Sequence, residues 1–528
     1  MKTNCVFFLI IFMLSIVFNS SSQTFQKTYG GINNDYGQSV AQTTDSGFII
    51  AGVTYSYASG NINCDMYLIK TDVKGDTVWT KTFGNIDIDR ANSVAQTLDG
   101  GYILTGSTSY FSGAVLYLVK TDSFGNILWS KTIPAGIACL GNSVRQVPSD
   151  SGYIIGGSAL QWGMMQSYVY LIRTDSQGDT LWVKTFGENA YFDGAYSVTQ
   201  ADDGGFAVSG YTISGAGGYD IYIVKFDAAG NMLWKKSFGG TANEYGYSIA
   251  RTSDNGYIIS GSTNSFGAGV DDVYLIKTND IGDTLWTRTY GGSGNDQGYF
   301  LQQTFDNGFI VCGSTNSFGA GSNDVYIIKT DSSGNVIWSK TYGGSGNDNG
   351  HSIYQTLDNG YIITGVTESF GAGDSDVYLI KTDAFGNSGC NEINVVTIMG
   401  TPPSIVSDPV TIFGNDVESS IPVGAAIGNG SIVNTLCTNV NIKEITIAES
   451  FIIYPNPAQS KINIKLKVPS EKFEIKLFDV TGQIILEKSM KNISNSINIA
   501  LPELSNGIYF LNLRNEKYNM SEKVFIKN

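Results

Sequence analysis

Between Phe25 and Cys390 the chain alternates apolar and polar residues over short stretches, and turns rich in Gly, Asp and Asn separate these stretches. A period of two is typical of antiparallel strands. The last repeat shows this period at 352–356, 360–367 and 376–382, and a fourth stretch surrounds Trp338. No long stretch here has the period of a helix. The pattern therefore predicts an all-β fold built from four-stranded units.

The four-stranded unit recurs about every 50 residues, a period typical of β-propeller blades. Phe25 and Cys390 hold the same position as the six tryptophans that mark the period: Trp79, Trp129, Trp182, Trp234, Trp286 and Trp338. The chain enters the repeats at a fourth strand and leaves after a third one. The N-terminal strand is therefore expected to complete the last blade, which leaves no open edge there. We predict a seven-bladed β-propeller over residues 23–390.

One turn of each repeat carries an Asp that is followed by a Gly within two residues: Asp45, Asp99, Asp150, Asp203, Asp254, Asp306 and Asp358. Asp accepts a hydrogen bond from the backbone two residues on, and Gly supplies a positive φ. We therefore interpret these residues as turn formers rather than ligands.

The remaining chain divides into three parts. Residues 1–22 combine Lys2 with an apolar run from Cys5 to Phe18 and small residues, which is typical of a secretory signal peptide and too short for a membrane span. Residues 391–447 lose the period and are rich in Pro, Gly, Ser and Val. They are either short extended pieces that lie against the propeller or a spacer. Residues 448–528 contain six alternating stretches, which predict a small β-sandwich.

The C-terminal region carries specific motifs. Tyr454, Pro455, Asn456 and Pro457 are followed by LFDVTGQ, which contains Gly482, and by LSNGIYFLNL, which contains Gly507. This order resembles the type A C-terminal sorting domain of the type IX secretion system. The resemblance implies recognition by the outer-membrane translocon and a protein that is secreted or attached to the outer cell surface. The repeats also resemble those of secreted bacterial β-propellers, which implies the fold and no activity.

Cysteine usage and charge narrow the possible partners. Cys390 and Cys437 bracket one segment, and secretion permits a disulfide between them. A bridge between Cys64 and Cys139 is a second possibility, and Cys312 is expected in the core. The formal net charge of −15 argues against nucleic acid and anionic membranes as partners.

Residues able to carry chemistry are few. His351 is the sole histidine, so a multi-histidine metal site is excluded. Neither a nucleophile elbow nor a phosphate-binding loop occurs. Six repeats carry an acid just before the first strand, namely Asp35, Asp89, Asp193, Glu244, Asp296 and Asp348, whereas one carries Cys139. These acids either form a Ca²⁺-binding ring at one mouth of the channel or cap their own loops, and the second interpretation is favoured.

A second acidic set precedes the third strand: Asp65, Asp220, Asp272, Asp324 and Asp376. The second and third repeats have Val115 and Tyr168 at this position, and their loops are apolar and aromatic. The candidate ligand-binding residues of these loops are Tyr110, Phe111, Trp162, Met164, Met165 and Tyr168. Exposed aromatic side chains suit stacking on sugars or peptides, although the loops could instead fold onto a neighbouring blade.

Two functions are compatible with these residues. The favoured hypothesis is a binding or adhesion scaffold that recognises a glycan or a surface protein through one propeller face. The alternative is a carbohydrate-active enzyme that uses two carboxylates at the channel mouth, for example Glu244 and Asp193. A quinone-dependent propeller enzyme is a third idea that rests on architecture alone.

Overall fold

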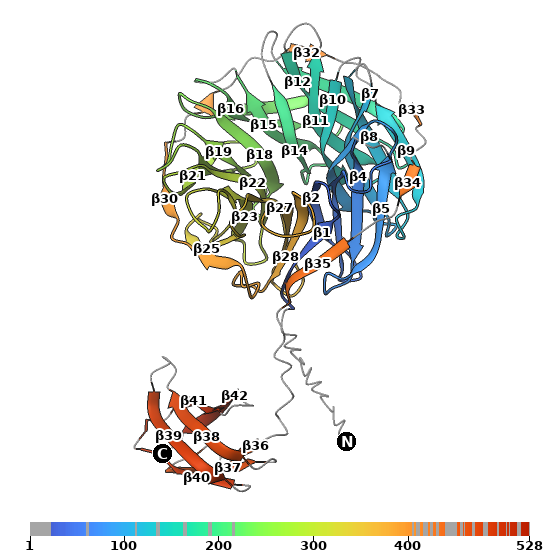
Figure 1. Cartoon of the computed structure of the whole chain (residues 1–528). Helices are drawn as coiled ribbons and strands as arrows, with labels where there is room; N and C mark the ends of the chain where they lie inside the picture. The colour runs from blue at the N-terminus through green and yellow to red at the C-terminus, as the bar shows by residue number, and fades with distance from the viewer. Residues whose placement is uncertain are drawn as a thin grey trace, which may run out of the picture. The chain divides into compact units, whose positions relative to one another are not determined.

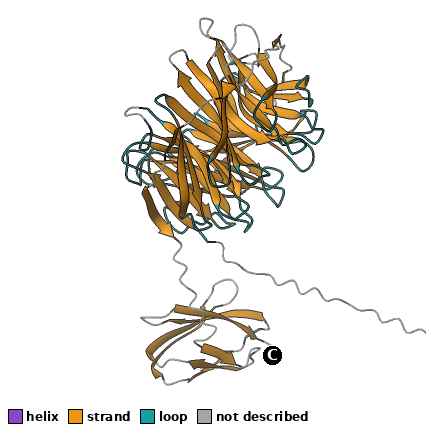
Figure 2. Cartoon of the chain, turned by 90° about the vertical axis from the view of Figure 1, so that its right-hand side faces the viewer, coloured by secondary structure: helices purple, strands orange, loops and turns teal. Residues whose placement is uncertain are grey.

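The computed structural model divides the chain into two compact units, Met1–Asn439 and Val440–Asn528. It describes residues 23–438 and 451–526 with short gaps. In the first unit the gaps are 60–62, 111–112, 134–137, 162–165, 188–192, 214–216, 404–405, 408–411, 415–420, 423–425 and 429–431. In the second they are 455–457, 459, 467–469, 479–483, 494–495, 503, 506 and 515–518. The described residues form strands, turns and loops, without a helix (Figure 2).

Seven sheets stand around a central channel in the first unit, which confirms the predicted seven-bladed propeller (Figure 1). Blade 1 consists of β2 (Asp35–Gln42), β3 (Phe48–Thr54), β4 (Asp65–Thr71) and β5 (Thr77–Gly84). Blade 2 consists of β6 (Ile88–Gln96), β7 (Tyr102–Tyr110), β8 (Gly113–Thr121) and β9 (Ile127–Ile133). Blade 3 consists of β10 (Ala138–Gln146), β11 (Tyr153–Gln161), β12 (Gln166–Thr174) and β13 (Thr180–Gly187). Blade 4 consists of β14 (Gly194–Gln200), β15 (Phe206–Thr212), β16 (Asp220–Phe226) and β17 (Met232–Phe238). Blade 5 consists of β18 (Glu244–Arg251), β19 (Tyr257–Thr263), β20 (Asp272–Thr278) and β21 (Thr284–Gly291). Blade 6 is β22 (Asp296–Gln303), β23 (Phe309–Thr315), β24 (Asp324–Thr330) and β25 (Val336–Tyr342).

Blade 7 closes the ring as expected. It combines β26 (Asp348–Gln355), β27 (Tyr361–Thr367) and β28 (Asp376–Thr382) with the N-terminal strand β1 (Phe25–Gly30). β1 pairs antiparallel with β28, with Phe25 opposite Lys381 and Tyr29 opposite Val377. The first strand therefore completes the last blade, as the repeat boundaries predicted.

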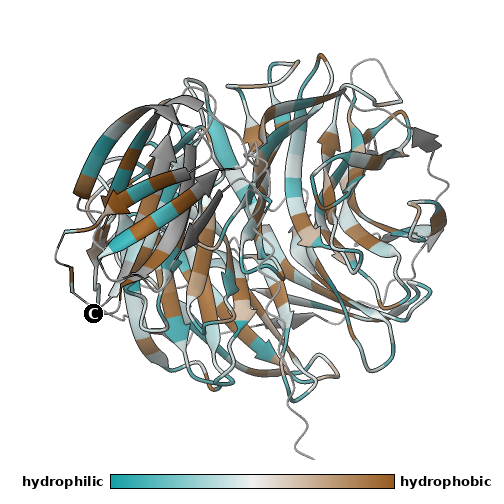
Figure 3. Ribbon diagram, turned by 90° about the horizontal axis from the view of Figure 1, so that it is seen from below, coloured by the Kyte–Doolittle hydropathy of each residue, from teal (hydrophilic) through white to brown (hydrophobic). Residues whose placement is uncertain are grey.

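The middle strands of each blade are buried on both faces, because the neighbouring blades cover them. β19, β20, β23 and β24 are buried at every position. Their residues are consequently mostly apolar, and Figure 3 shows apolar bands along the strands. The innermost strands alternate buried and half-buried residues instead, as β22 does.

The periodic tryptophans join adjacent blades. Trp286 of blade 5 lies edge-on against Phe309 of blade 6, with ring centroids 5.9 Å apart. Phe25 takes the tryptophan position in blade 7 and packs against Phe48 of blade 1 at 6.2 Å. The recurring tryptophan of the sequence thus marks one aromatic contact at each blade junction.

The conserved turn position of the repeat holds an ion pair as well as a turn. Asp254 accepts a backbone hydrogen bond from Gly256 and lies 2.9 Å from Nζ of the buried Lys277. The same pair occurs in all seven blades: Lys70–Asp45, Lys120–Asp99, Arg173–Asp150, Lys225–Asp203, Lys277–Asp254, Lys329–Asp306 and Lys381–Asp358. These aspartates therefore neutralise a cation that the middle strands bury.

Residues 391–438, called the belt from here on, add a fifth strand to every blade. The belt runs backwards around the ring from blade 6 to blade 1 and ends on blade 7, and its orange segments lie on the outside of the propeller in Figure 1. Its strands are β29 (Glu392–Asn394), β30 (Ile398–Gly400), β31 (Val406–Ser407), β32 (Ile412–Gly414), β33 (Ile421–Pro422), β34 (Ala426–Gly428) and β35 (Ile432–Thr438). For the described residues of 391–438 the first of the two alternatives holds, because short extended pieces lie against the propeller, and these residues are not a spacer. Residues 439–447 of the predicted region lie outside the described residues.

A disulfide between Cys390 and Cys437 joins the two ends of the belt, with Cα atoms 6.3 Å apart. β35 pairs with β1 along its length, so Cys437 lies opposite the buried Gln26 of the closing strand. The alternative bridge between Cys64 and Cys139 is wrong, because both residues are buried thiols that form no disulfide. Cys312 is also free and belongs to the core between blades 6 and 7.

The second unit has two sheets that share one core, as a small β-sandwich does. One sheet contains β36 (Phe451–Tyr454), β37 (Lys461–Leu466) and β40 (Ser496–Ala500). The other contains β38 (Ser470–Phe478), β39 (Ile484–Ile493), β41 (Gly507–Arg514) and β42 (Asn519–Ile526). Ile464 and Ile499 of the first sheet pack in one cluster with Leu477 and Leu511 of the second.

Candidate functional site in the central channel

Every innermost strand of the propeller contains a β-bulge at the same place. In β2 the pairing with β3 shifts between Gly37 and Ser39, which leaves Gln38 as the extra residue. The equivalent residues form what we call the bulge ring: Gln38, Asn92, Asn142, Tyr196, Tyr247, Tyr299 and His351. A bulge redirects one side chain without breaking the sheet. All seven residues line a cavity of about 700 Å³ in the channel.

One half of the bulge ring ties neighbouring blades together. Asn92 Nδ2 donates to the carbonyl of Gly141 at 3.0 Å, and Asn142 Nδ2 donates to the carbonyl of Ala195 at 2.7 Å. Each acceptor lies on the innermost strand of the next blade. This half presents amide groups to the channel.

The other half of the bulge ring is aromatic. The rings of Tyr196 and Tyr247 lie 5.2 Å apart, and those of Tyr247 and Tyr299 lie 5.3 Å apart. Three further tyrosines continue these contacts. The ring of Tyr211 lies 5.4 Å from that of Tyr196, and the ring of Tyr245 lies 6.1 Å from that of Tyr247. The rings of Tyr211, Tyr245 and Tyr219 lie 5.4 to 5.8 Å from one another. We call the six residues the tyrosine cluster: Tyr196, Tyr211, Tyr219, Tyr245, Tyr247 and Tyr299.

Burial raises the pKa of several of these phenols, including Tyr196, Tyr247 and Tyr299. They therefore stay protonated at neutral pH and keep their hydroxyl hydrogen for donation. The cluster offers neutral aromatic faces and hydroxyl groups, opposite the amides of the other half.

His351 lies between the two halves, with its ring 6.1 Å from that of Tyr299. Its Nδ1 donates to the carbonyl of Gly37 at 2.8 Å, because a carbonyl oxygen can only accept. Burial lowers the pKa of His351, so the ring is neutral at pH 7 and Nε2 carries no proton. The residue closes the ring between blades 7 and 1 and adds one acceptor to the channel.

The acids expected around the channel mouth are buried within their own loops. Glu244 Oε2 accepts a hydrogen bond from Gly240 N at 2.8 Å, and Asp296 Oδ2 accepts one from Gly292 N at 2.8 Å. Asp35, Asp89, Asp193 and Asp348 occupy the equivalent positions and are at most 1% exposed. Within the described ranges, no group of three or more metal-binding side chains occurs.

The predicted aromatic loop residues fall largely outside the described residues. Phe111, Trp162, Met164 and Met165 lie in the gaps, and Tyr110 ends β7. Tyr168 is half-buried in β12, and its ring would meet a Cβ placed at Gly187. Of the sorting motif, Tyr454 ends β36 and Gly507 begins β41, whereas Pro455, Asn456, Pro457 and Gly482 fall in gaps.

The amino-acid sequence alone did not predict the bulge ring. Each bulge interrupts the period of two. The alternation therefore predicts a first strand that starts after the acid, whereas β26 begins at Asp348 itself. A signal does exist in the repeat: the residue between a Gly or Ala and a Ser (Phe300 in blade 6) varies between amide, tyrosine and histidine.

Residues 452–527 match the family described as secretion system C-terminal sorting domain. The regulatory protein FlaEY of Caulobacter vibrioides is 27% identical over 244 residues, which cover 43% of this chain and 24% of that protein. The chain thus matches about a quarter of the length of this curated relative.

Two solved structures are similar at low identity. Sqt1 from Chaetomium thermophilum bound to the N-terminus of the ribosomal protein L10 is 12% identical, with a TM-score of 0.38, and the match covers 67% of this chain and 98% of that one. The extracellular domain of the putative one component system BT4673 from B. thetaiotaomicron is 11% identical, with a TM-score of 0.17 and coverages of 96% and 98%.

The sorting domain and the seven blades together define the class: this is a secreted β-propeller protein. Its C-terminal unit is a sorting domain of the type IX secretion system, so the protein engages that system and is secreted or attached to the outer cell surface. In the part of the chain that the structure describes, no helix is long and apolar enough to cross a membrane.

Proposed function

We propose that the protein is a binding scaffold that captures an extracellular glycan in its central channel. The observation that carries this proposal is the asymmetry of the bulge ring, which lines the cavity with amides from blades 1 to 3 and with tyrosines from blades 4 to 6. Sugar rings stack on aromatic faces through their C–H groups, while their hydroxyl groups need amide and phenol partners. The two halves supply both kinds of contact in one cavity.

The tyrosine cluster supports a chain-like ligand rather than a single sugar. Tyr245 lies nearly parallel to Tyr247, with an angle of 13° between the rings. Tyr211 and Tyr219 contact Tyr245 and continue the cluster beyond the residues that line the cavity. A row of aromatic rings offers successive stacking positions. The channel volume of about 700 Å³ has room for a few sugar units.

The enzymatic alternative gains no comparable support. Glu244 and Asp193 are at most 1% exposed, and Glu244 is held by the backbone of its own loop. Hydrolysis of a glycosidic bond requires two carboxyl groups that reach the substrate. Binding without chemistry is therefore the function that these residues favour.

A glycan array followed by calorimetry tests the proposal. Tyr247→Ala and the double variant Tyr219→Ala/Tyr245→Ala are expected to weaken binding of the captured glycan at least about tenfold, because each removes a stacking surface. Phe385→Ala is the matched control: Phe385 is an aromatic side chain 71% exposed on a different turn, and its removal should leave affinity unchanged.

Equal affinity for wild type and the tyrosine variants would refute a channel site. Capture of a protein but of no glycan on parallel arrays would refute the glycan and leave a protein ligand in its place. Melting curves of each variant establish that the propeller remains folded.

A further inference from the structure

The two acidic sets of the repeats meet in pairs at the blade junctions. Asp324 begins β24 of blade 6, and Asp348 begins β26 of blade 7. A Cβ placed at Gly343, which follows β25, would lie 2.4 Å from Asp324 Oδ1 and 2.6 Å from Asp348 Oδ2. The two carboxylates therefore lie side by side over the bare backbone of this glycine.

The same arrangement occurs at five of the seven junctions. Gly30, Gly84, Gly239, Gly291 and Gly343 each have two carboxylate oxygens within 2.7 Å of the position that a Cβ would take. The pairs are Asp376–Asp35, Asp65–Asp89, Asp220–Glu244, Asp272–Asp296 and Asp324–Asp348. Each glycine leaves the space into which both carboxylates reach.

Hydrogen bonds to the loops satisfy only some of the carboxylate oxygens of these pairs. Asp324 Oδ2 accepts hydrogen bonds from Ala320 N and Gly321 N, and Asp348 Oδ2 accepts them from Gly344 N and Ser369 Oγ. Asp324 is fully buried, yet its Oδ1, which points to Asp348, has no hydrogen-bond partner. Asp65 Oδ1 repeats this at the junction of blades 1 and 2, in a residue 2% exposed.

Four of the five pairs also form no ion pair with a basic side chain among the described residues. Every turn aspartate of the blades has a Lys or Arg partner, whereas Asp65–Asp89, Asp272–Asp296, Asp324–Asp348 and Asp376–Asp35 form no ion pair within the described residues. Two buried like charges without a counter-charge are strongly unfavourable. Burial and the charge of Asp348 both raise the pKa of Asp324, which is the expected sign of an uncompensated pair.

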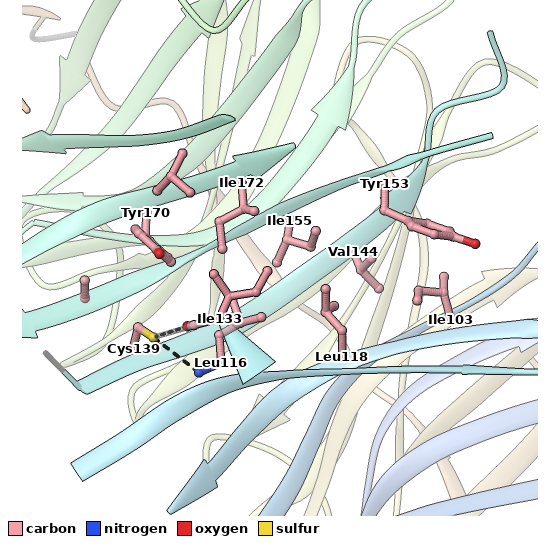
Figure 4. Packing of buried hydrophobic residues seen from close by; sticks show 12 residues of the cluster. Ile103, Leu116, Leu118, Ile133, Cys139, Val144, Tyr153, Ile155, Tyr170 and Ile172 are labelled. Atoms are coloured by element: carbon pink, nitrogen blue, oxygen red, sulfur yellow. Dashed lines mark hydrogen bonds between the residues drawn. The ribbon is translucent and has the colours of Figure 1, made fainter. Parts of the chain in front are cut away.

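The remaining junctions serve as an internal comparison. Between blades 2 and 3 both acids are absent: Val115 and Cys139 replace them, and Pro134, outside the described residues, stands at the glycine position. Cys139 is satisfied there by Leu116 N and the Ile133 carbonyl (Figure 4). At this junction the two acids and the glycine are replaced together. Between blades 3 and 4, Tyr168 replaces one acid while Asp193 and Gly187 remain.

We propose that each carboxylate pair binds a divalent cation, Ca²⁺ in the extracellular medium, and that up to five such ions join adjacent blades. Carboxylate, hydroxyl and backbone oxygens are the hard ligands that Ca²⁺ prefers. With only two carboxylates per site, the affinity is expected in the range of extracellular modules, about 10⁻⁴ to 10⁻³ M. This site lies between blades and is distinct from a carboxylate ring around the channel.

Terbium luminescence of the full chain tests the proposal. The charges of Asp348 and Asp324 both act on the buried phenol of Tyr378, which places a tyrosine beside this pair. Excitation of tyrosine is therefore expected to produce terbium emission that Ca²⁺ competes away. Calorimetry should give up to five equivalents of Ca²⁺, and Asp324→Asn should remove one of them.

Asp193→Asn is the matched control, because Asp193 holds the same place in its repeat and is equally buried but faces Tyr168 instead of an acid. It should leave the number of sites unchanged. Wild-type melting with Ca²⁺ or with chelator gives a second readout that needs no variant, and Ca²⁺ should raise the melting temperature by several degrees.

Absence of both sensitised emission and a Ca²⁺-dependent melting temperature would overturn the proposal. A melting temperature that depends on pH but not on Ca²⁺ would also overturn it, since each pair would then share a proton. An equal loss of sites in Asp193→Asn would show that the pairs are not the binding unit.

Discussion

Opening the disulfide that joins the ends of the belt should destabilise the propeller. The belt encircles all seven blades, and Cys390 and Cys437 are separated by 47 residues. Closing a loop of this length lowers the conformational entropy of the unfolded chain, which stabilises the folded state by about 4 kcal/mol at 25 °C. The double variant Cys390→Ser/Cys437→Ser is therefore expected to lose about 4 kcal/mol of unfolding free energy.

The local effect should concentrate at the closing strand. β1 has β28 on one side and β35 on the other, and Gln26 of β1 donates a hydrogen bond to Ser388 Oγ at 2.8 Å beside the disulfide. Once the ends separate, the two- and three-residue belt strands have few hydrogen bonds to hold them. We expect protease cleavage within 391–438 to become faster.

Guanidinium unfolding and limited proteolysis of wild type, reduced wild type and the double variant measure both effects. Reductant should lower the stability of wild type and leave the double variant unchanged, since Cys64, Cys139 and Cys312 form no disulfide that it could open. Identical unfolding midpoints and identical cleavage rates in all three samples would show that the disulfide does not restrain the belt.

Two further predictions concern buried charges. Asp254→Asn removes the negative charge that pairs with the buried Lys277. Because Asp254 is about half exposed, the expected loss of unfolding free energy is about 1–2 kcal/mol, measured by chemical denaturation. The exposed Asp280→Asn is the control and should cost less than about 0.5 kcal/mol. Burial, with a smaller contribution from Asp65, raises the pKa of Asp89 to about 6. The folded state then binds more protons than the unfolded state between about pH 4 and 6, so in chelator the melting temperature should fall as the pH rises through this window. Asp89→Asn should flatten this fall and Asp122→Asn should not; a profile that Asp89→Asn leaves unaltered would contradict the assigned titration.

The period of the sequence was sufficient for the propeller, because each repeat carries its own strand pattern and one aromatic residue for the next blade. Trp286 and Phe309 illustrate this: they are 23 residues apart and meet across a junction that recurs with the repeat. The position of Phe25 in the same series likewise indicated that the first strand closes the ring. Local alternation and exact recurrence are properties of the chain itself.

The belt and the bulge ring depended on the tertiary structure. Strands of two or three residues such as β31 and β33 are too short to show a period, and only the open edges of the blades select them. The bulge residues lie about 50 positions apart, and each bulge breaks the alternation that sequence reasoning uses. The amino-acid sequence by itself determined the repeated blade, because the signals of a blade are local. The tertiary structure alone decided which residues converge on the channel, the blade junctions and the belt. Those contacts form only when seven sheets surround one axis.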